Sequence, residues 1–176
     1  RDEWAGHWER RMRVSPVTLP ARGEALDPGP AVRAATHPVE ALPMQLGVGD
    51  IPCPGRQPGG RMGGEALLES FLDARGETYR QGMSSPASAW RVCSRLSPHI
   101  AYGTLSLREI VQTHRRRWMA LKAEAPRSNW ARSLKSFESR LHWHCHFIQK
   151  FEDEPALEYR NMHRGYDGLR DESRTD

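Results

Sequence analysis

The uneven distribution of proline is the feature that most constrains how this chain can fold. Nine of the 13 prolines lie between residues 15 and 63, and each removes a backbone donor and disfavours a helix just before it. We therefore expect an irregular, Pro/Gly-rich connector over residues 15–62, between a helix over 1–14 and a helical domain over 63–176. Plain disorder is the alternative for the connector, because structureless stretches of this length are uncommon inside compact domains.

Apolar residues on both sides of the connector recur with the period of an α-helix. Trp4, Trp8 and Met12 are spaced by four residues near the N-terminus. Ser97 before Pro98 is typical of a helix start, and the run of residues 106–109 is a capping box. Helices are expected over 64–75, at 89–92, from 98, over 107–123 and from 128 to 151. No segment alternates as a strand does, so the sequence predicts an all-α fold.

The longest expected helix presents an apolar stripe that should face a core. Its members recur at three- and four-residue steps: Trp130, Leu134, Phe137, Leu141, Ile148 and Phe151. A second stripe, about 100° around the same helix, contains Arg140, Trp143 and Phe147.

Charge and cysteine content narrow the class of protein. The chain carries 26 Lys and Arg against 22 Asp and Glu, a mild excess that favours nucleic acid as a partner only weakly. No stretch approaches the roughly 20 apolar residues that span a bilayer, so no membrane-spanning protein is expected. The three cysteines are far apart, which favours a reducing cytosolic or nuclear compartment, and we expect a cytoplasmic protein. Because the chain begins at Arg1 without Met or an apolar leader, we expect a piece of a longer protein.

Residues 93–98 form the first candidate site. Small hydroxyl residues precede a helix that starts near Pro98, and the free amides of such a helix favour an anion such as phosphate. Ser94 and Ser97 would add hydroxyl donors. The alternative is that Ser97 only caps its helix.

Residues 137–147 form the second candidate site. On a helix, His142, Cys145 and His146 share one face and could hold zinc, but no fourth ligand is nearby and we expect no metal. Trp143 beside Arg140 could instead stack on an unstacked base. Core packing is the alternative for Trp143.

The basic run of residues 114–117 is the third candidate site. Arg115, Arg116 and Arg117 could contact the phosphates of DNA. A solvated helix end explains the same run equally well.

Three segments taken in order resemble the start of the FAD-binding helical domain of the photolyase and cryptochrome family. They are GGEALLESFL over 63–72, SRLSPHIAYGTLSLR over 94–108 and RLHWH over 140–144. The last falls where the family has a Glu-Leu-x-Trp-Arg segment, and the pattern suggests a divergent bacterial branch. The resemblance covers about residues 60–176, so the sequence predicts part of that flavin-binding domain.

The resemblance implies roles for individual residues. Tyr79 and the segment Ser94, Arg95, Leu96 and Ser97 would bind the flavin phosphates, and Phe137 would flank the cofactor. Trp143 would stack on a pyrimidine lesion flipped out of DNA. Arg140 and His144 stand where the family has Glu and Arg, and Cys93 replaces the usual Thr. The first two departures put dimer repair in its usual form in doubt.

The resemblance implies a flavoprotein that uses blue light to repair pyrimidine lesions in DNA by electron transfer from reduced FAD. A cryptochrome-like sensor without repair activity is the alternative, and a helical module that has lost flavin is a third possibility. An antenna domain and further flavin-enclosing helices are expected elsewhere in the parent chain. Residues 1–176 alone should therefore be helical, marginally stable, inactive and unable to retain FAD.

Overall fold

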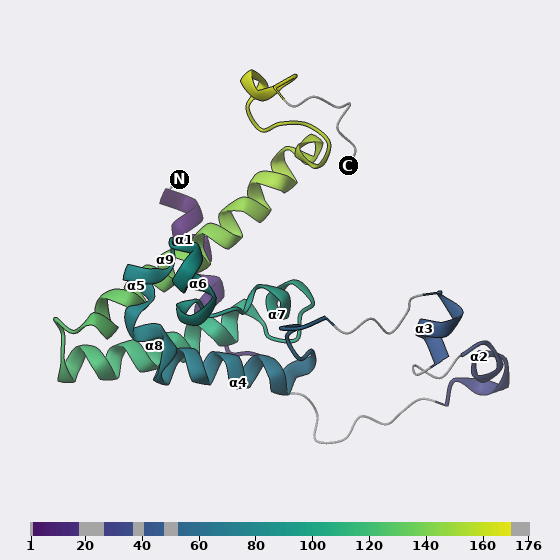
Figure 1. Ribbon diagram of the computed structural model, residues 1–176, viewed down its shortest axis with the longest axis horizontal. Coiled ribbons are helices and arrows are strands. Elements are labelled where there is room, and N and C mark those ends of the chain that lie inside the picture. Colours follow the sequence, from purple (N-terminus) through teal and green to yellow (C-terminus); the bar gives the residue numbers. More distant parts are fainter. Residues whose placement is uncertain (1, 18–26, 37–40, 48–52, 170–176) are drawn as a thin grey trace.

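The computed structural model describes residues 2–17, 27–36, 41–47 and 53–169 (Figure 1). Within these residues the chain is mainly helical and has no strand, which confirms the predicted all-α class. The elements are α1 (Asp2–Arg13), α2 (Gly29–Ala35), α3 (Leu42–Gln45), α4 (Gly60–Asp73), the 3₁₀ turn η2 (Arg75–Thr78), α5 (Tyr79–Gly82), α6 (Pro86–Val92), α7 (Ser97–Ala101), α8 (Leu107–Glu124), α9 (Asn129–Asp153), and the 3₁₀ turns η3 (Pro155–Glu158) and η4 (Arg164–Tyr166). Among the described helices, none is both long and apolar enough to cross a bilayer.

The core lies where α4, α8 and α9 meet, and α1 closes it from one side. Its fully buried side chains include Phe71 from α4, Ile110 and His114 from α8, and Leu134 from α9. Trp8 of α1 is also buried, as the four-residue spacing predicts. In Figure 1 the C-terminal half of α9 leaves this body and carries the yellow C-terminal segment away from it.

Helix starts were well predicted where a side-chain cap exists. The Ser106 hydroxyl accepts from the Glu109 N–H at 3.2 Å, and the Glu109 carboxylate accepts from the Ser106 N–H at 2.9 Å, which completes the capping box of α8. Ser128 caps α9 in the same way, accepting from the Ala131 N–H. Ser97 does not cap α7. It is the first residue of that helix, and Leu96 occupies the cap position without a side-chain bond.

The prediction that residues 15–62 contain no helix is wrong. Pro30 lies in the first turn of α2 and Pro43 in the first turn of α3, where a missing N–H costs no helical hydrogen bond. Neither helix buries a residue, and Figure 1 shows both set apart from the others. Helix α4 likewise starts at Gly60, earlier than the expected residue 64.

The predicted apolar stripe of α9 is buried only in the first half of the helix. Leu134, Phe137 and Leu141 are buried, but Ile148 and Phe151 are 49% and 44% exposed. The reason is geometric, since the second half of α9 extends past the ends of α4 and α8 (Figure 1). Periodicity shows which face of a helix is apolar and not where its neighbours end.

A short segment between α4 and α6 takes its shape from α9. Ser133 of α9 is 1% exposed. Its hydroxyl donates to the Glu77 carbonyl at 2.7 Å and accepts from the Arg80 N–H at 3.2 Å. This hydroxyl joins η2 to α5 and serves as a cap supplied by a different helix.

The carboxylate of Glu109 links helix α8 to α4 and should make stability depend on pH. A hydrogen bond from Arg61 at 2.7 Å is the main reason that its pKa falls to about 2 from a usual 4.5. A group with a lowered folded pKa stabilises the fold above its unfolded pKa, and this contribution is lost as pH falls through the folded pKa. We expect Glu109→Gln to lower the free energy of unfolding by about 1 kcal/mol at pH 6, since Arg61 is 50% exposed and water screens the pair, and progressively less from pH 4.5 to pH 2.

Urea unfolding of wild type and variant at several pH values measures this difference. Glu65→Gln is the matched control, since Glu65 pairs with the same arginine but is 52% exposed. A constant difference between the Glu109→Gln variant and wild type from pH 6 to pH 2 would contradict the expectation.

Candidate functional site

A pocket of about 760 Å³ lies between α6 and α7. It brings together the predicted residues Ser94, Arg95, Leu96 and Ser97. Leu96 is only 1% exposed, so its side chain belongs to the core and only its backbone can face a ligand. The remaining lining residues are Arg56, Gln57, Ala89, Trp90, Cys93 and Pro98. Sequence reasoning missed Arg56 and Gln57, because they lie in the stretch that was expected to be an irregular connector.

The backbone of the pocket is held in an unusual conformation at Arg95. Its φ is 60°, and it is the one non-glycine residue with positive φ in the described part of the chain. With its amide oriented to satisfy both groups, Gln57 donates to the Arg95 carbonyl at 3.2 Å and accepts from Arg95 Nε at 2.7 Å. Strain of this kind is kept only where the surroundings fix it and is common at ligand sites.

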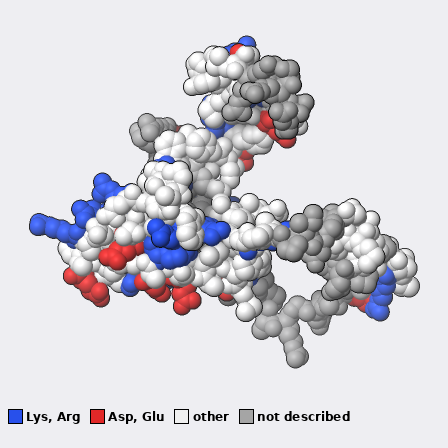
Figure 2. Space-filling view, in the orientation of Figure 1, with Lys and Arg blue, Asp and Glu red and all other residues white. Residues whose placement is uncertain are grey.

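The pocket carries positive charge. Arg56 and Arg95 line it, and its lining contains no Asp or Glu. Figure 2 shows Lys and Arg side chains gathered over α6, on the face turned to the viewer. Helix α7 has only five residues, so its dipole adds little to the hydroxyl and guanidinium donors that line the pocket.

Tyr79 and Phe137 lie in the core and do not line this pocket. They are 7% and 4% exposed, and both rings contact Phe71, with centroids 5.5 and 4.6 Å away. Burial raises the pKa of the Tyr79 hydroxyl, and the nearby Arg140 side chain acts in the opposite direction. The structure thus places Arg140 beside Tyr79, although the residue itself is exposed.

Trp143 lies outside the core, as its position on the helical wheel predicts. It is 47% exposed and lines a groove of about 790 Å³ with Trp4, His142 and His146 among others. Its ring lies 5.6 Å from those of His146 and Phe147. His144, the other predicted site residue on α9, is partly buried, and its Nδ1 has no partner among the described residues.

The three arginines of the basic run point to different neighbours. Arg115 pairs with Glu9 and Glu138, each at 2.6 Å. Arg117 reaches Asp73 at 3.6 Å. Arg116 is exposed and donates to the Thr113 hydroxyl. Arg116 is thus the member of the run best placed to meet a phosphate backbone.

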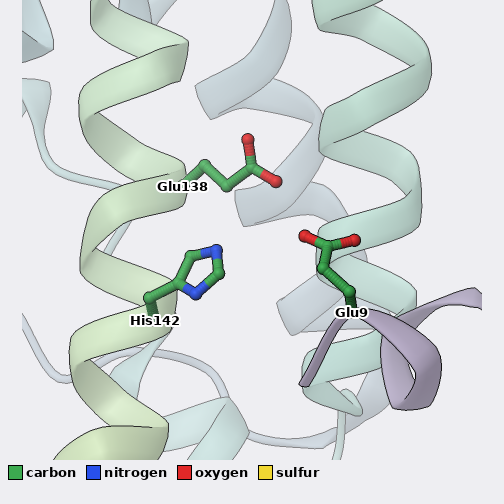
Figure 3. A group of neighbouring side chains, drawn as sticks. All are labelled: Glu9, Glu138 and His142. Atoms are coloured by element: carbon green, nitrogen blue, oxygen red, sulfur yellow. The ribbon is translucent and has the colours of Figure 1, made fainter. Parts of the chain in front are cut away.

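Glu9, Glu138 and His142 converge between α1 and α9, and Figure 3 shows the three side chains pointing toward one another. Their ligand atoms lie within 4.8 Å, a separation that suits a metal ion. However, the Arg115 guanidinium bridges both carboxylates, so a cation already occupies this place. The His142 ring stacks on Trp8 with centroids 3.6 Å apart, and burial lowers its pKa. The cluster is an ion-pair network that fastens α1 to α8 and α9.

Among the described residues, His142, Cys145 and His146 do not form a group close enough to hold zinc. His142 faces Trp8, whereas His146 is exposed beside Trp143. Cys145 is partly buried, and burial raises the pKa of its thiol, which disfavours the thiolate that a metal needs.

Comparison of the chain with models of protein families, with curated proteins and with solved structures found no match. Function must therefore be inferred from the motifs and from the geometry of these residues.

Proposed function

We propose that this chain is the FAD-binding part of a photolyase-like flavoprotein that repairs pyrimidine lesions in DNA with light. The observation that carries the proposal is the basic pocket lined by residues 94–97, whose lining contains no Asp or Glu. These are the same residues for which the family resemblance implies phosphate binding. When bound, reduced FAD supplies the light-driven electron. The protein residues bind and orient the two partners.

Within this proposal, Ser94 and Ser97 donate hydroxyl hydrogens to the phosphate oxygens. Arg95 and Arg56 lower the electrostatic energy of the diphosphate, since the lining holds no carboxylate that would repel it. Tyr79 and Phe137 are buried in the core and are absent from the lining of the pocket, so they do not contact the phosphates in this proposal. The fit therefore concerns the diphosphate of FAD.

DNA is the proposed partner. Trp143 has a half-exposed ring that lines a groove of about 790 Å³, and an exposed aromatic ring is a surface on which an unpaired base stacks. Arg116 offers a cation for the phosphate backbone. A cytoplasmic location fits three cysteines that are all free thiols, and an antenna domain is proposed for the parent chain.

A cryptochrome-like light sensor is the second candidate function, and Arg140 favours it. The resemblance puts a lesion-binding carboxylate at this position, whereas this chain presents an exposed cation next to Tyr79. A guanidinium cannot accept the hydrogen bonds that a pyrimidine N–H would offer to a carboxylate.

Titration of the chain with FAD, riboflavin and inorganic pyrophosphate tests the proposal. We expect weak FAD binding that pyrophosphate competes away, and about tenfold weaker binding of riboflavin, because the pocket recognises the diphosphate. Replacing both Ser94 and Ser97 with alanine should weaken FAD by a similar factor, whereas Ser139→Ala on α9 should not.

Equal affinity for FAD and riboflavin would contradict the proposal. A thymine-dimer oligonucleotide separates repair from sensing, because a repair protein prefers it to undamaged DNA and a sensor does not.

A further inference from the structure

All three guanidinium nitrogens of Arg75 donate hydrogen bonds, and several of these bonds go to the segment that leads into the pocket. Nε donates to the Ser70 hydroxyl at 2.9 Å, and Nη2 donates to the Leu67 carbonyl at 3.1 Å, which fastens the group to α4. On the other side, Nη1 donates to the Cys93 carbonyl at 2.5 Å and to the Arg91 carbonyl at 3.3 Å. Nη2 also reaches the Ser94 carbonyl at 3.4 Å. One side chain thus ties α4 to residues 91–94.

This arginine has no acidic partner among the ion pairs of the described residues. It is partly buried, and its pKa is lowered first by that burial and then by the nearby positive charge of Arg95. The hydrogen-bond acceptors of Arg75 are all neutral, namely the Ser70 hydroxyl and the backbone carbonyls of Leu67, Arg91, Cys93 and Ser94. An anion bound beside residues 94–95 would supply the missing negative charge.

The hydrogen bonds of Arg75 also fix the direction of two amide groups. In a trans peptide the C=O and the following N–H point in opposite directions. Because Arg75 holds the carbonyls of Cys93 and Ser94, the N–H groups of Ser94 and Arg95 point away from it. Ser94 and Arg95 line the pocket whereas Arg75 does not. In the described part of the chain, these two N–H groups donate to no protein atom.

We propose that Arg75 is a positioning residue that turns the Ser94 and Arg95 amides toward a bound diphosphate. Two adjacent N–H groups and the Ser94 hydroxyl then form a concave donor set, a geometry that suits phosphate oxygens. The inference rests on the proposed function, since it assigns the diphosphate of the cofactor to these two amides. Lysine cannot replace Arg75, because an ammonium lacks the planar fork that reaches α4 and residues 91–94 together.

Arg75→Lys tests the proposal because it keeps the charge and removes the fork. Binding of inorganic pyrophosphate, followed by amide shifts of the ¹⁵N-labelled chain, should weaken about tenfold. Arg80→Gln is the matched control, because it removes an exposed charge from α5, outside the pocket lining, and leaves the Arg80 N–H that donates to Ser133 in place. Binding should change about twofold at most in that variant. Ser70→Ala, which removes only the acceptor of Nε, is the milder variant if Arg75→Lys unfolds, and should weaken binding about threefold.

The unliganded proteins provide a second readout. In Arg75→Lys the Ser94 and Arg95 amides should shift and exchange faster, while those of Ile110 and Val111 in the core stay unchanged. Pyrophosphate affinity equal to wild type in Arg75→Lys, or unchanged Ser94 and Arg95 amides, would overturn the role of Arg75. Failure of the wild-type chain to bind pyrophosphate would instead overturn the proposed function, and the unliganded amide shifts would still decide whether Arg75 positions them.

Discussion

Replacing Phe137 with alanine is expected to lower the free energy of unfolding by about 3 to 5 kcal/mol. The side chain is 4% exposed, and its ring lies 4.6 Å from that of Phe71 and 5.6 Å from that of His114. Alanine leaves a cavity among α4, α8 and α9 that these rings cannot fill without moving the helices. Urea unfolding followed by circular dichroism at 222 nm measures the loss.

Phe147→Ala is the matched control, since it makes the same change ten residues later on α9. Phe147 is 52% exposed, so less apolar area is lost and we expect a cost below about 1 kcal/mol. Equal costs for the two variants would show that the core does not lie at Phe137. A Phe137→Ala protein of wild-type stability with weaker FAD binding would favour the cofactor contact that the resemblance implies.

Replacing Arg115 with methionine should lower the free energy of unfolding by about 2 kcal/mol, the second-largest effect that we expect. The reason is that two carboxylates are left facing each other. The Glu138 side chain is 22% exposed and the Glu9 side chain is 36% exposed. Water therefore cannot fully solvate either carboxylate once Arg115 is lost. The hydrogen bond from Arg115 is the main cause that lowers the pKa of Glu9 below its usual 4.5. The stabilisation is present above pH 4.5 and is lost as pH falls through the lowered value. The deficit of the variant should therefore be largest at neutral pH and shrink in acid.

Arg116→Met is the control for this experiment, because it removes the neighbouring charge from an exposed side chain. Its effect should stay within about 0.5 kcal/mol. Adding Glu9→Gln to Arg115→Met should restore part of the loss by removing one of the repelling charges. A deficit that is independent of pH would contradict the ion-pair explanation.

Local sequence signals predicted the long helices because their causes are local. The capping box at Ser106 and the cap at Ser128 fix where α8 and α9 begin, and these bonds join residues three apart. The same rules misjudged the proline-rich stretch, because Pro30 and Pro43 fall in first turns, where proline is tolerated. The number of prolines in a segment does not show whether each one falls in the first turn of a helix or in its interior.

The candidate site could be predicted only in part. Residues 94–97 are neighbours in the chain, so their meeting in one pocket follows from sequence. The pairing of Arg115 with Glu9 joins residues 106 positions apart, and no periodicity indicates it. Arg75 has the sequence context of an exposed helix end. Its contacts with the Cys93 and Ser94 carbonyls exist because the chain folds back beside α4, and this cannot be read from the sequence.

The Ser133 hydroxyl described above affects the order in which the protein folds. Its partners Arg80 and Glu77 lie 53 and 56 residues earlier in the chain, so their bonds form only after a long loop has closed. Helices α8 and α9 depend on local bonds and can form earlier. We therefore expect residues 75–82, and with them the fork of Arg75, to acquire their final shape late in folding, after α9 has docked. Assembly of the pocket that residues 94–97 line then depends kinetically on α9, a helix that contributes no residue to that lining.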